Sequence, residues 1–392
     1  MSMPKGPQVF PRTEYLRRLS AVKAEMKRRE IGVLMVTSPA NITYLSGYTS
    51  KSGYVPQGLV VSLKEEEPTF FTRHMDGPAA MHQMFIDSGR VIGYPEELIA
   101  NPDMDGFDAV IDFLHDKGFA SSGVGLEAKF VSAQTVEKFK TRMPKARVVD
   151  FGAGIHWIRG IKSDLEIALM REAAANADAG MMRAKEVIHP GAREADAAAE
   201  IIAALVRGVN GKPSTDLSGF YLCASPRSAT AHIRWSEDVF RQGSQINLEV
   251  GGVRHGYTSA LMRTFSIGKP SDQLRRVHEG EVAGLEAALA VVKPGAVCGD
   301  VAAAFNATLK KHGFEKKSRC GYAIGIDWTE PTASLKEGDR TVLKPNMTFH
   351  LMLGNWIDQD LGYVISETFR VTDTGAETFS KLPRELFELD PI

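Results

Sequence analysis

The sequence predicts an α+β protein in which a smaller α/β domain, residues 1–155, precedes a larger α+β domain, residues 156–392. A chain of 392 residues exceeds one ordinary core, and its 43% hydrophobic residues can fill two. In the first part, strand-like and helix-like segments alternate. In the second part, pairs of helix-like segments stand between groups of strand-like segments, which is typical of an α+β domain.

The first domain begins with a charged, helix-like segment and continues as alternating strands and helices. We predict helices at 12–30, 78–88 and 104–117, and strands at 31–38, 58–63, 68–72, 90–94 and 123–127. The turn-forming residues 39–41 are predicted to close the first strand. The domain is expected to end near residue 150, with 151–161 as the link.

The second domain opens with a long amphipathic helix over 162–188. Ser163 is its predicted N-cap, and Glu166, three residues later, completes a capping box. Further helices are predicted at 194–209, 271–292 and 299–313, and strands at 220–225, 245–250, 256–267, 347–353 and 364–372. Two helices followed by strands therefore occur twice, at 163–267 and at 271–371.

Residues 246–268 are the most informative stretch, because they predict a hairpin with one polar face. Ile246, Leu248 and Val250 alternate with Asn247 and Glu249, so the two sets point to opposite faces of the strand. The pair at 251–252 is Gly-Gly and is predicted to break this strand, and a second strand opens at 257. The hairpin is expected to line a polar site.

Glu249 is a single carboxylate in an otherwise apolar run, and a charge in such a place needs a reason. It could serve as a catalytic nucleophile or base, or it could form a buried ion pair with Arg254 or Arg263. His232 precedes this strand by about ten residues, and an imidazole titrates near neutral pH. It is a candidate for proton transfer, although a lone histidine is more often structural.

The composition argues for a soluble enzyme and against several other classes of protein. The formal net charge is −1, so no electrostatic attraction to nucleic acid or an anionic membrane is expected. Three widely spaced cysteines form no zinc motif and predict reduced thiols in a cytoplasmic setting. The sequence shows no signal-peptide pattern and no run of about 18 apolar residues, so neither export nor a membrane span is expected.

Four separated segments resemble the creatinase/prolidase/methionine aminopeptidase family. They are PANITYLSGY at 39–48, IRGIKSDLEIALMREA at 158–173, HGYTSALMRTFSIG at 255–268 and KPGAVCGDV at 293–301. The first looks like a strand motif of the family's N-terminal domain. The resemblance implies a pita-bread catalytic domain at the C-terminus, preceded by a smaller creatinase-type α/β domain.

The family binds two divalent metals through five ligands, and the resemblance places these on positions that mostly lack ligand atoms. The first two fall on Glu249 and Ala260, the third on Tyr322, the fourth on Met352, and the last close to Glu367. Hard divalent cations need several oxygen or imidazole ligands each. We therefore predict a site with no metal and no other cofactor.

The metal-independent creatinase branch has an alanine at the Ala260 position, but its acidic residue two positions later is Met262 here. Because Glu249 supplies the acid instead, the resemblance implies a different small zwitterion, one with a cyclic amidinium. The expected enzyme is a hydrolase of C–N bonds other than peptide bonds. Glu249 would act as nucleophile or general base, and His232 as acid and base.

The resemblance also implies further contacts to the substrate. Glu367 would be a second catalytic carboxylate, unless it is a surface residue, and Tyr257, Tyr322 and Trp356 would line the pocket. Family members are homodimers in which the N-terminal domain of one subunit helps to hold the substrate of the other. The matching loop, 50–58, offers the backbone of Gly53 and Tyr54, with Arg73 further on.

Three alternatives stay open from the sequence. The chain could be a prolidase-type metallopeptidase with unusual ligands, a creatinase-like amidinohydrolase, or a non-catalytic binding module of the same fold.

Overall fold

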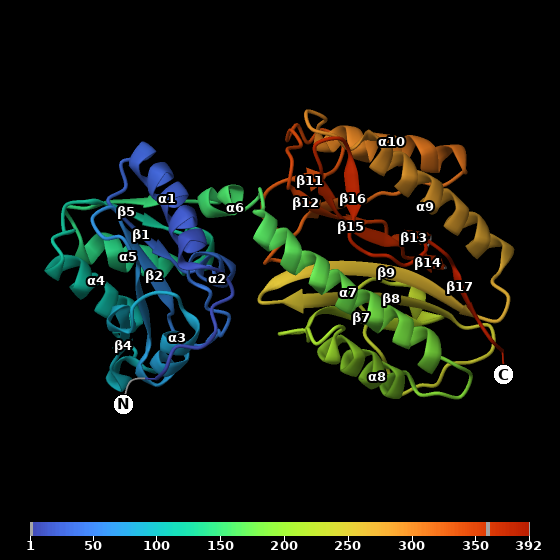
Figure 1. The fold of residues 1–392 in the computed structure, drawn as a ribbon, viewed down its shortest axis with the longest axis horizontal. Helices are drawn as coiled ribbons and strands as arrows, with labels where there is room; N and C mark the ends of the chain where they lie inside the picture. The colour runs from blue at the N-terminus through green and yellow to red at the C-terminus, as the bar shows by residue number, and fades with distance from the viewer. Residues whose placement is uncertain (1–2, 358–360, 392) are drawn as a thin grey trace. The chain divides into compact units, whose positions relative to one another are not determined.

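The computed structural model describes residues 3–357 and 361–391. Two compact units make up the chain, Met1–Arg159 and Gly160–Ile392 (Figure 1). The predicted boundary after residue 155 falls inside the short helix α6 (Gly154–Ile158), which belongs to the first unit. Among the described residues, no helix combines the length and the apolar character that crossing a membrane requires.

The first unit is built on a mixed six-stranded sheet of order β4-β3-β2-β1-β5-β6. Its strands are β1 (Val33–Val36), β2 (Gly58–Ser62), β3 (Thr69–Arg73), β4 (Val91–Tyr94), β5 (Gly123–Leu126) and β6 (Arg147–Asp150). Its other helices are α1 (Arg12–Arg28), α2 (Pro39–Ser46), α3 (Gly77–Gln83), α4 (Gly106–Asp116) and α5 (Ala133–Arg142). α4 and α5 pack on one sheet face, where Val33, Met35 and Val60 join their apolar side chains. The α/β prediction for this part of the chain is confirmed.

Three local predictions in this unit are wrong. Residues 39–46 form helix α2 rather than a closing turn or a strand, because the Ser38 side chain caps the Asn41 N–H and Pro39 occupies the first turn. The predicted helix 78–88 ends at Gln83. Helix α5 and strand β6 had no counterpart in the sequence prediction, since their short apolar patterns are weak.

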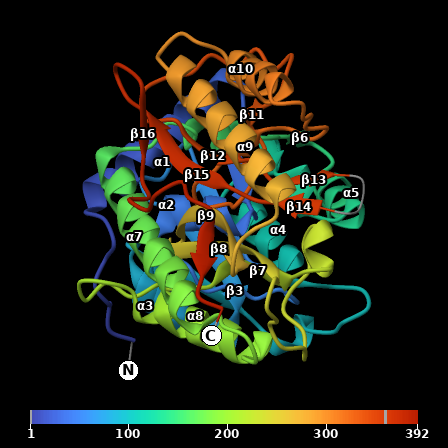
Figure 2. The same cartoon turned by 90° about the vertical axis from the view of Figure 1, so that its right-hand side faces the viewer.

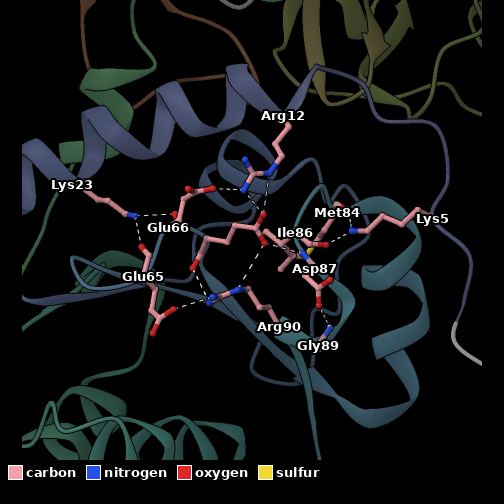
Figure 3. Close-up of polar contacts among 11 residues, drawn as sticks. Lys5, Arg12, Lys23, Glu65, Glu66, Met84, Ile86, Asp87, Gly89 and Arg90 are labelled. Atoms are coloured by element: carbon pink, nitrogen blue, oxygen red, sulfur yellow. Dashed lines mark hydrogen bonds and ion pairs between the residues drawn. The ribbon is translucent and has the colours of Figure 1, made fainter.

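A charged network fastens the acidic run 65–67 to α1 and to the β4 edge (Figure 3). Arg12 pairs with Glu66 and, at 2.8 Å, with Glu67, while Lys23 donates to the backbone carbonyl oxygen of Glu66 at 2.9 Å. Arg90 pairs with Glu65 at 2.9 Å. These side chains are mostly exposed, so solvent screens each pair and the pairs add little stability. The network fixes the turn between β2 and β3 and neutralises its negative charge.

The second unit contains two larger sheets, each covered by a pair of helices (Figures 1 and 2). The sheet β17-β9-β8-β7 packs against α7 (Asp164–Val187) and α8 (Glu194–Arg207). The sheet β11-β10-β12-β15-β16 packs against α9 (Asp272–Val291) and α10 (Cys298–Lys311). This arrangement confirms both the α+β prediction and the twofold occurrence of helix pairs followed by strands.

The strands of the second unit are bounded as follows. They are β7 (Ser218–Ala224), β8 (Gln245–Arg254), β9 (Tyr257–Ile267), β10 (Gly321–Ala323), β11 (Ser334–Leu335), β12 (Thr348–Met352), β13 (Asn355–Ile357), β14 (Leu361–Tyr363), β15 (Ser366–Val371), β16 (Ala376–Thr378) and β17 (Phe387–Leu389). β13 and β14 pair only with each other. The predicted capping box of α7 is present, since Ser163 and Glu166 each bond the other's backbone N–H.

The pair Gly251–Gly252 does not break β8, which corrects the sequence prediction. The strand continues to Arg254, and the turn lies at His255 and Gly256, both with positive φ. The glycines serve close packing instead, because a Cβ on Gly252 would lie 1.9 Å from the carbonyl oxygen of Ala173 in α7. The missing side chain of Gly252 lets α7 approach the hairpin, while Glu249 lies on the opposite face. A Cβ on Gly251 would instead meet Ser218 and Trp328.

Candidate functional site

A cavity of about 440 Å³ opens in the second unit between the β8–β9 hairpin and the segments around 230, 320 and 356. Its walls are mostly apolar and aromatic, with few polar groups, which is typical of small-molecule sites. The lining residues are Tyr221, Cys223, Thr230, His232, Ile233, Asn247, Glu249, Met262, Ser318, Arg319, Tyr322, Trp328, Thr329, Met352, Trp356 and Val364.

Glu249 projects into this cavity from the middle of β8. Strand alternation sends Ile246, Leu248 and Val250 into the core against α7 and α8, so Asn247 and Glu249 face the cavity, as the sequence predicted. In the part of the chain that the structure describes, no side chain bonds to the Glu249 carboxyl. Its burial therefore raises its pKa to about 8, with desolvation as the cause.

The ion-pair alternative for Glu249 is wrong. Arg254 pairs with Glu172 at 3.0 Å, and Arg263 pairs with Glu367 at 2.8 Å. Both guanidinium groups are thus committed to other carboxylates. A desolvated carboxyl that faces a cavity without a partner is a strong candidate for a functional group.

The raised pKa of Glu249 predicts a pH dependence of stability. Because the native state holds a proton that the unfolded chain releases, the free energy of unfolding should fall as the pH rises from 4.5 toward 8. Glu249→Gln should flatten this part of the curve. Urea unfolding of both proteins between about pH 5 and about pH 9 measures the difference. Identical pH profiles would contradict the assignment.

His232 faces the same cavity from the loop between β7 and β8. It is solvent-exposed, and its ring centroid lies 5.4 Å from that of Tyr221. Its φ of 60° is unusual for a residue other than glycine, so the loop around it must be held in place. The structure thus brings His232 and Glu249 to one cavity.

Tyr322 also lines the cavity, at the position where the family has a histidine ligand. Its hydroxyl accepts a hydrogen bond from Trp328 Nε1 at 2.8 Å and lies 3.2 Å from His350 Nδ1. Burial, and then the nearby Glu249, raise its pKa to about 12, so the hydroxyl keeps its proton near neutral pH. The Tyr322 hydroxyl can therefore donate one hydrogen bond, either to His350 Nδ1 or to a group in the cavity.

Trp356 lines the cavity as predicted, whereas Tyr257 and Glu367 do not. The Tyr257 hydroxyl donates to Glu166 Oε1 at 2.8 Å beneath α7. Glu367 is buried and accepts from Arg263 at 2.8 Å and from Arg384 at 3.4 Å. It therefore holds the fold together instead of facing the cavity, and it is not a surface residue either.

Gly53 and Tyr54 lie in the first unit, on a separate depression of about 420 Å³ formed by residues of α2, the loop 48–57 and segment 130–135. Tyr54 is 68% exposed, and its hydroxyl accepts a hydrogen bond from Arg73. Arg73 also pairs with Glu96. That guanidinium is thus already engaged within its own unit.

Arg319 is a charged cavity residue that the sequence did not predict. Its guanidinium carbon stands 4.4 Å from the ring centroid of Tyr322, and no carboxylate among the described residues pairs with it. It lies in a loop two residues before β10, where no periodic pattern marks it. The one indication in the sequence is that Arg319 stands shortly before Tyr322, a position that matches a metal ligand of the family.

Two family models match this chain: metallopeptidase family M24 over residues 168–373, and the creatinase/prolidase N-terminal domain over residues 18–161. The chain belongs to metallopeptidase family M24. It is 65% identical over 387 residues to the uncharacterized hydrolase/peptidase y4tL of Sinorhizobium fredii, covering 98% of this chain and 99% of the relative.

This M24 chain is also 36% identical over 393 residues to the ectoine hydrolase of Halomonas elongata, covering 96% of this chain and 98% of the relative. Among solved structures, the dipeptidase PepE of Mycobacterium ulcerans has a TM-score of 0.82 at 22% identity, covering 97% of this chain and 99% of that one. The structural likeness confirms the pita-bread fold with a creatinase-type N-terminal domain.

The M24 metal pair does not fit the residues of this cavity. Glu249 and Tyr322 face it at two of the five ligand positions, and Met352 and the apolar Ala260 occupy two more. Met352 of β12 lies opposite Ser366 of β15, so the side chain of Ser366, and not that of Glu367, points to the same face of the sheet as Met352. Among the described residues, no set of three clustered His, Cys, Asp or Glu ligands includes Glu249. One carboxylate cannot hold two hard cations.

Proposed function

We propose that this chain is a metal-independent hydrolase that opens the ring of a cyclic amidinium zwitterion, with ectoine as the substrate and 5-hydroxyectoine as a second one. The observation that carries the proposal is Glu249, a lone carboxyl with a pKa near 8 in an apolar, aromatic cavity. An amidinium restores the ionised form of such a carboxyl, because an opposite charge offsets desolvation. The ectoine hydrolase relative supports the choice of ring.

The reaction consumes one water and breaks one ring C–N bond. The Glu249 carboxylate either attacks the carbon between the two nitrogens or removes a proton from the water that attacks it. The tetrahedral carbon then expels one ring nitrogen, which needs a proton to leave as an amine. In the route through direct attack, water then adds to the carbon bound to Glu249, and the bond from that carbon to the carboxylate oxygen breaks, which frees Glu249. In both routes the product is an N-acetyl-2,4-diaminobutyrate, so all atoms of substrate and water are retained.

Other side chains of the cavity can assist these steps. His232 carries the proton from the attacking group to the leaving nitrogen, because an imidazole ring can both accept and donate a proton. Tyr322 keeps its proton and donates a hydrogen bond to the developing charge. Tyr322 and Trp356 also offer aromatic faces to a cation, worth about 0.5 to 2 kcal/mol.

Turnover of ectoine, 5-hydroxyectoine, creatine and Xaa-Pro dipeptides by the purified chain tests the proposal. We expect ring opening of the two cyclic amidines alone. Cleavage of creatine would assign a creatinase-like amidinohydrolase, and cleavage of the dipeptides a peptidase. No turnover of any of them would favour a non-catalytic binding module.

Arg319 is proposed to hold the substrate carboxylate, because its guanidinium lines the cavity without an ion pair to any described carboxylate. Charge-assisted hydrogen bonds to a carboxylate contribute about 1.5 to 3 kcal/mol. Arg319→Ala should therefore raise KM about 10- to 100-fold while changing kcat less. Steady-state kinetics measure this, with Arg276→Ala as the control, since Arg276 lies over Phe314 outside the cavity. An unchanged KM would remove Arg319 from the substrate site.

A homodimer in the cytoplasm stays a prediction. Three buried, unpaired cysteines fit a reducing compartment, and the loop of Gly53 and Tyr54 would complete the cavity of a partner subunit. Sedimentation gives the oligomeric state. Tyr54→Ala, which changes an exposed side chain, should raise KM without lowering the free energy of unfolding. Unchanged kinetics would separate this loop from the site.

A further inference from the structure

Asn247 is a cavity residue whose side-chain amide bonds to neighbouring segments of the chain. Its Nδ2 donates to the carbonyl oxygens of Ser228, at 3.1 Å, and Gly362, at 3.0 Å. Its Oδ1 accepts from Gln245 Nε2 at 3.1 Å, and Thr264 Oγ1 also lies 3.1 Å from it. Both donor hydrogens of the amide are therefore used, and Gln245 takes one of its two acceptor lone pairs. The residue is 6% exposed, so these bonds are shielded from water.

The two carbonyl groups belong to two different segments of the cavity wall. Ser228 lies in the turn Arg227–Ala229, at the start of the loop that carries Thr230 and His232. Gly362 lies in β14, whose partner strand β13 carries Trp356. Asn247 and Glu249 are two residues apart on the same face of β8. One side chain thus joins the strand of Glu249 to both walls.

The walls also meet each other directly at this point. A Cβ on Gly362 would lie 1.8 Å from the carbonyl oxygen of Ser228, so only glycine permits the contact. Gln245 Nε2 bonds the same Gly362 carbonyl oxygen, and Thr264 Oγ1 donates to that of Val364 at 2.9 Å. The positive φ of His232 requires a loop fixed from outside, and Asn247 supplies such a fixed point.

We propose that Asn247 is a positioning residue that clamps the His232 loop to the β14 wall and so sets the place of His232 relative to Glu249. Its catalytic consequence rests on the proposed function. Because small misplacements of reacting groups cost up to about 100-fold in rate, loss of the clamp should lower kcat by about 10- to 100-fold.

The contact that Asn247 makes between the two wall segments can be tested by a measurement other than turnover, the alkylation of Cys223. Cys223 lies directly across from Asn247 in β7 and lines the cavity, but it is 5% exposed and burial raises its pKa to about 11. Asn247→Leu keeps the branching of the side chain and removes its hydrogen bonds. Alkylation of Cys223 by iodoacetamide, mapped by mass spectrometry, should then become about tenfold faster or more. Cys298 and Cys320, which are buried outside the cavity, should keep their rates.

Two further variants make the result specific. Gly362→Ala pushes the Ser228 backbone away without touching Asn247, and it should reproduce both the faster alkylation and the lower kcat. Asn176→Leu is the matched control, because Asn176 is also a buried asparagine. It bonds Lys212, Ser214 and Val209, which do not line the cavity. It should lower stability while leaving Cys223 alkylation and kcat as in the wild type.

Unchanged Cys223 alkylation in both Asn247→Leu and Gly362→Ala would overturn the proposal. So would a lower kcat without faster alkylation, which would assign Asn247 to direct substrate contact, or faster alkylation with an unchanged kcat. If the wild type opens no ring, the fault lies with the proposed function, and the alkylation rates still decide whether Asn247 clamps the two walls.

Discussion

Glu249→Gln is expected to lower kcat for ring opening by about 10³-fold or more, because it removes both the nucleophile and the base from the cavity. The fold should be retained, since no described partner of the carboxyl is lost. Above about pH 8 the variant should even be more stable, because the wild type must then bury a charge.

Kinetics and urea unfolding of the same preparations test this expectation. Glu281→Gln is the matched control: Glu281 is another buried carboxyl, with a pKa raised to about 7, that bonds Asn355 and does not line the cavity. It should lose stability but keep most of its turnover. Wild-type turnover of Glu249→Gln would eliminate both chemical routes.

Arg263→Met is expected to lower the free energy of unfolding by about 3–5 kcal/mol, because it leaves a buried Glu367 carboxylate with little compensation. The two side chains are 0% and 2% exposed and 2.8 Å apart, and the remaining partner of Glu367, Arg384, is 3.4 Å away. Arg263 also donates to the carbonyl oxygens of Met262 and Ser366. Urea unfolding measures the loss.

The companion variant Glu367→Gln tests whether Glu367 has a structural or a catalytic role. It should be destabilised, yet at a temperature where it is folded its kcat should stay close to that of the wild type. The double variant with methionine at both positions should recover part of the stability, since it leaves no unpaired charge. A stable Glu367→Gln that had lost its turnover would restore Glu367 to the catalytic site.

The direction of the side chains was predicted correctly in β8 and wrongly for Tyr257 in β9 and Glu367 in β15. In β8 the alternation of apolar and polar residues placed Glu249 and Asn247 correctly. Glu367 was misplaced because a register slip of one residue moves a side chain to the other face of the sheet. Along β9, Tyr257 points to the same face as Leu261, which packs in the core, and away from the face of Met262, which lines the cavity. Its position could therefore have been predicted.

Other features depend on packing that no local pattern records. The role of Gly251 and Gly252 follows from the approach of α7 and from Trp328, whose ring lies where a Cβ on Gly251 would point. The segment just before helix α2 is held by Glu127, the residue that follows β5. Its buried carboxylate accepts hydrogen bonds from the N–H groups of Thr37 and Ser38. Arg319 reaches the cavity from an irregular loop, where sequence gives no direction to a side chain.

The most direct test of a metal-free site built on Glu249 is the rate of ectoine ring opening by the chain after chelation and removal of bound metals, followed by NMR. We predict that the stripped chain keeps its full rate with far less than one metal ion per chain. A rate that disappears on chelation and returns with about two divalent ions per chain, as the family's two-metal site would require, would contradict this account.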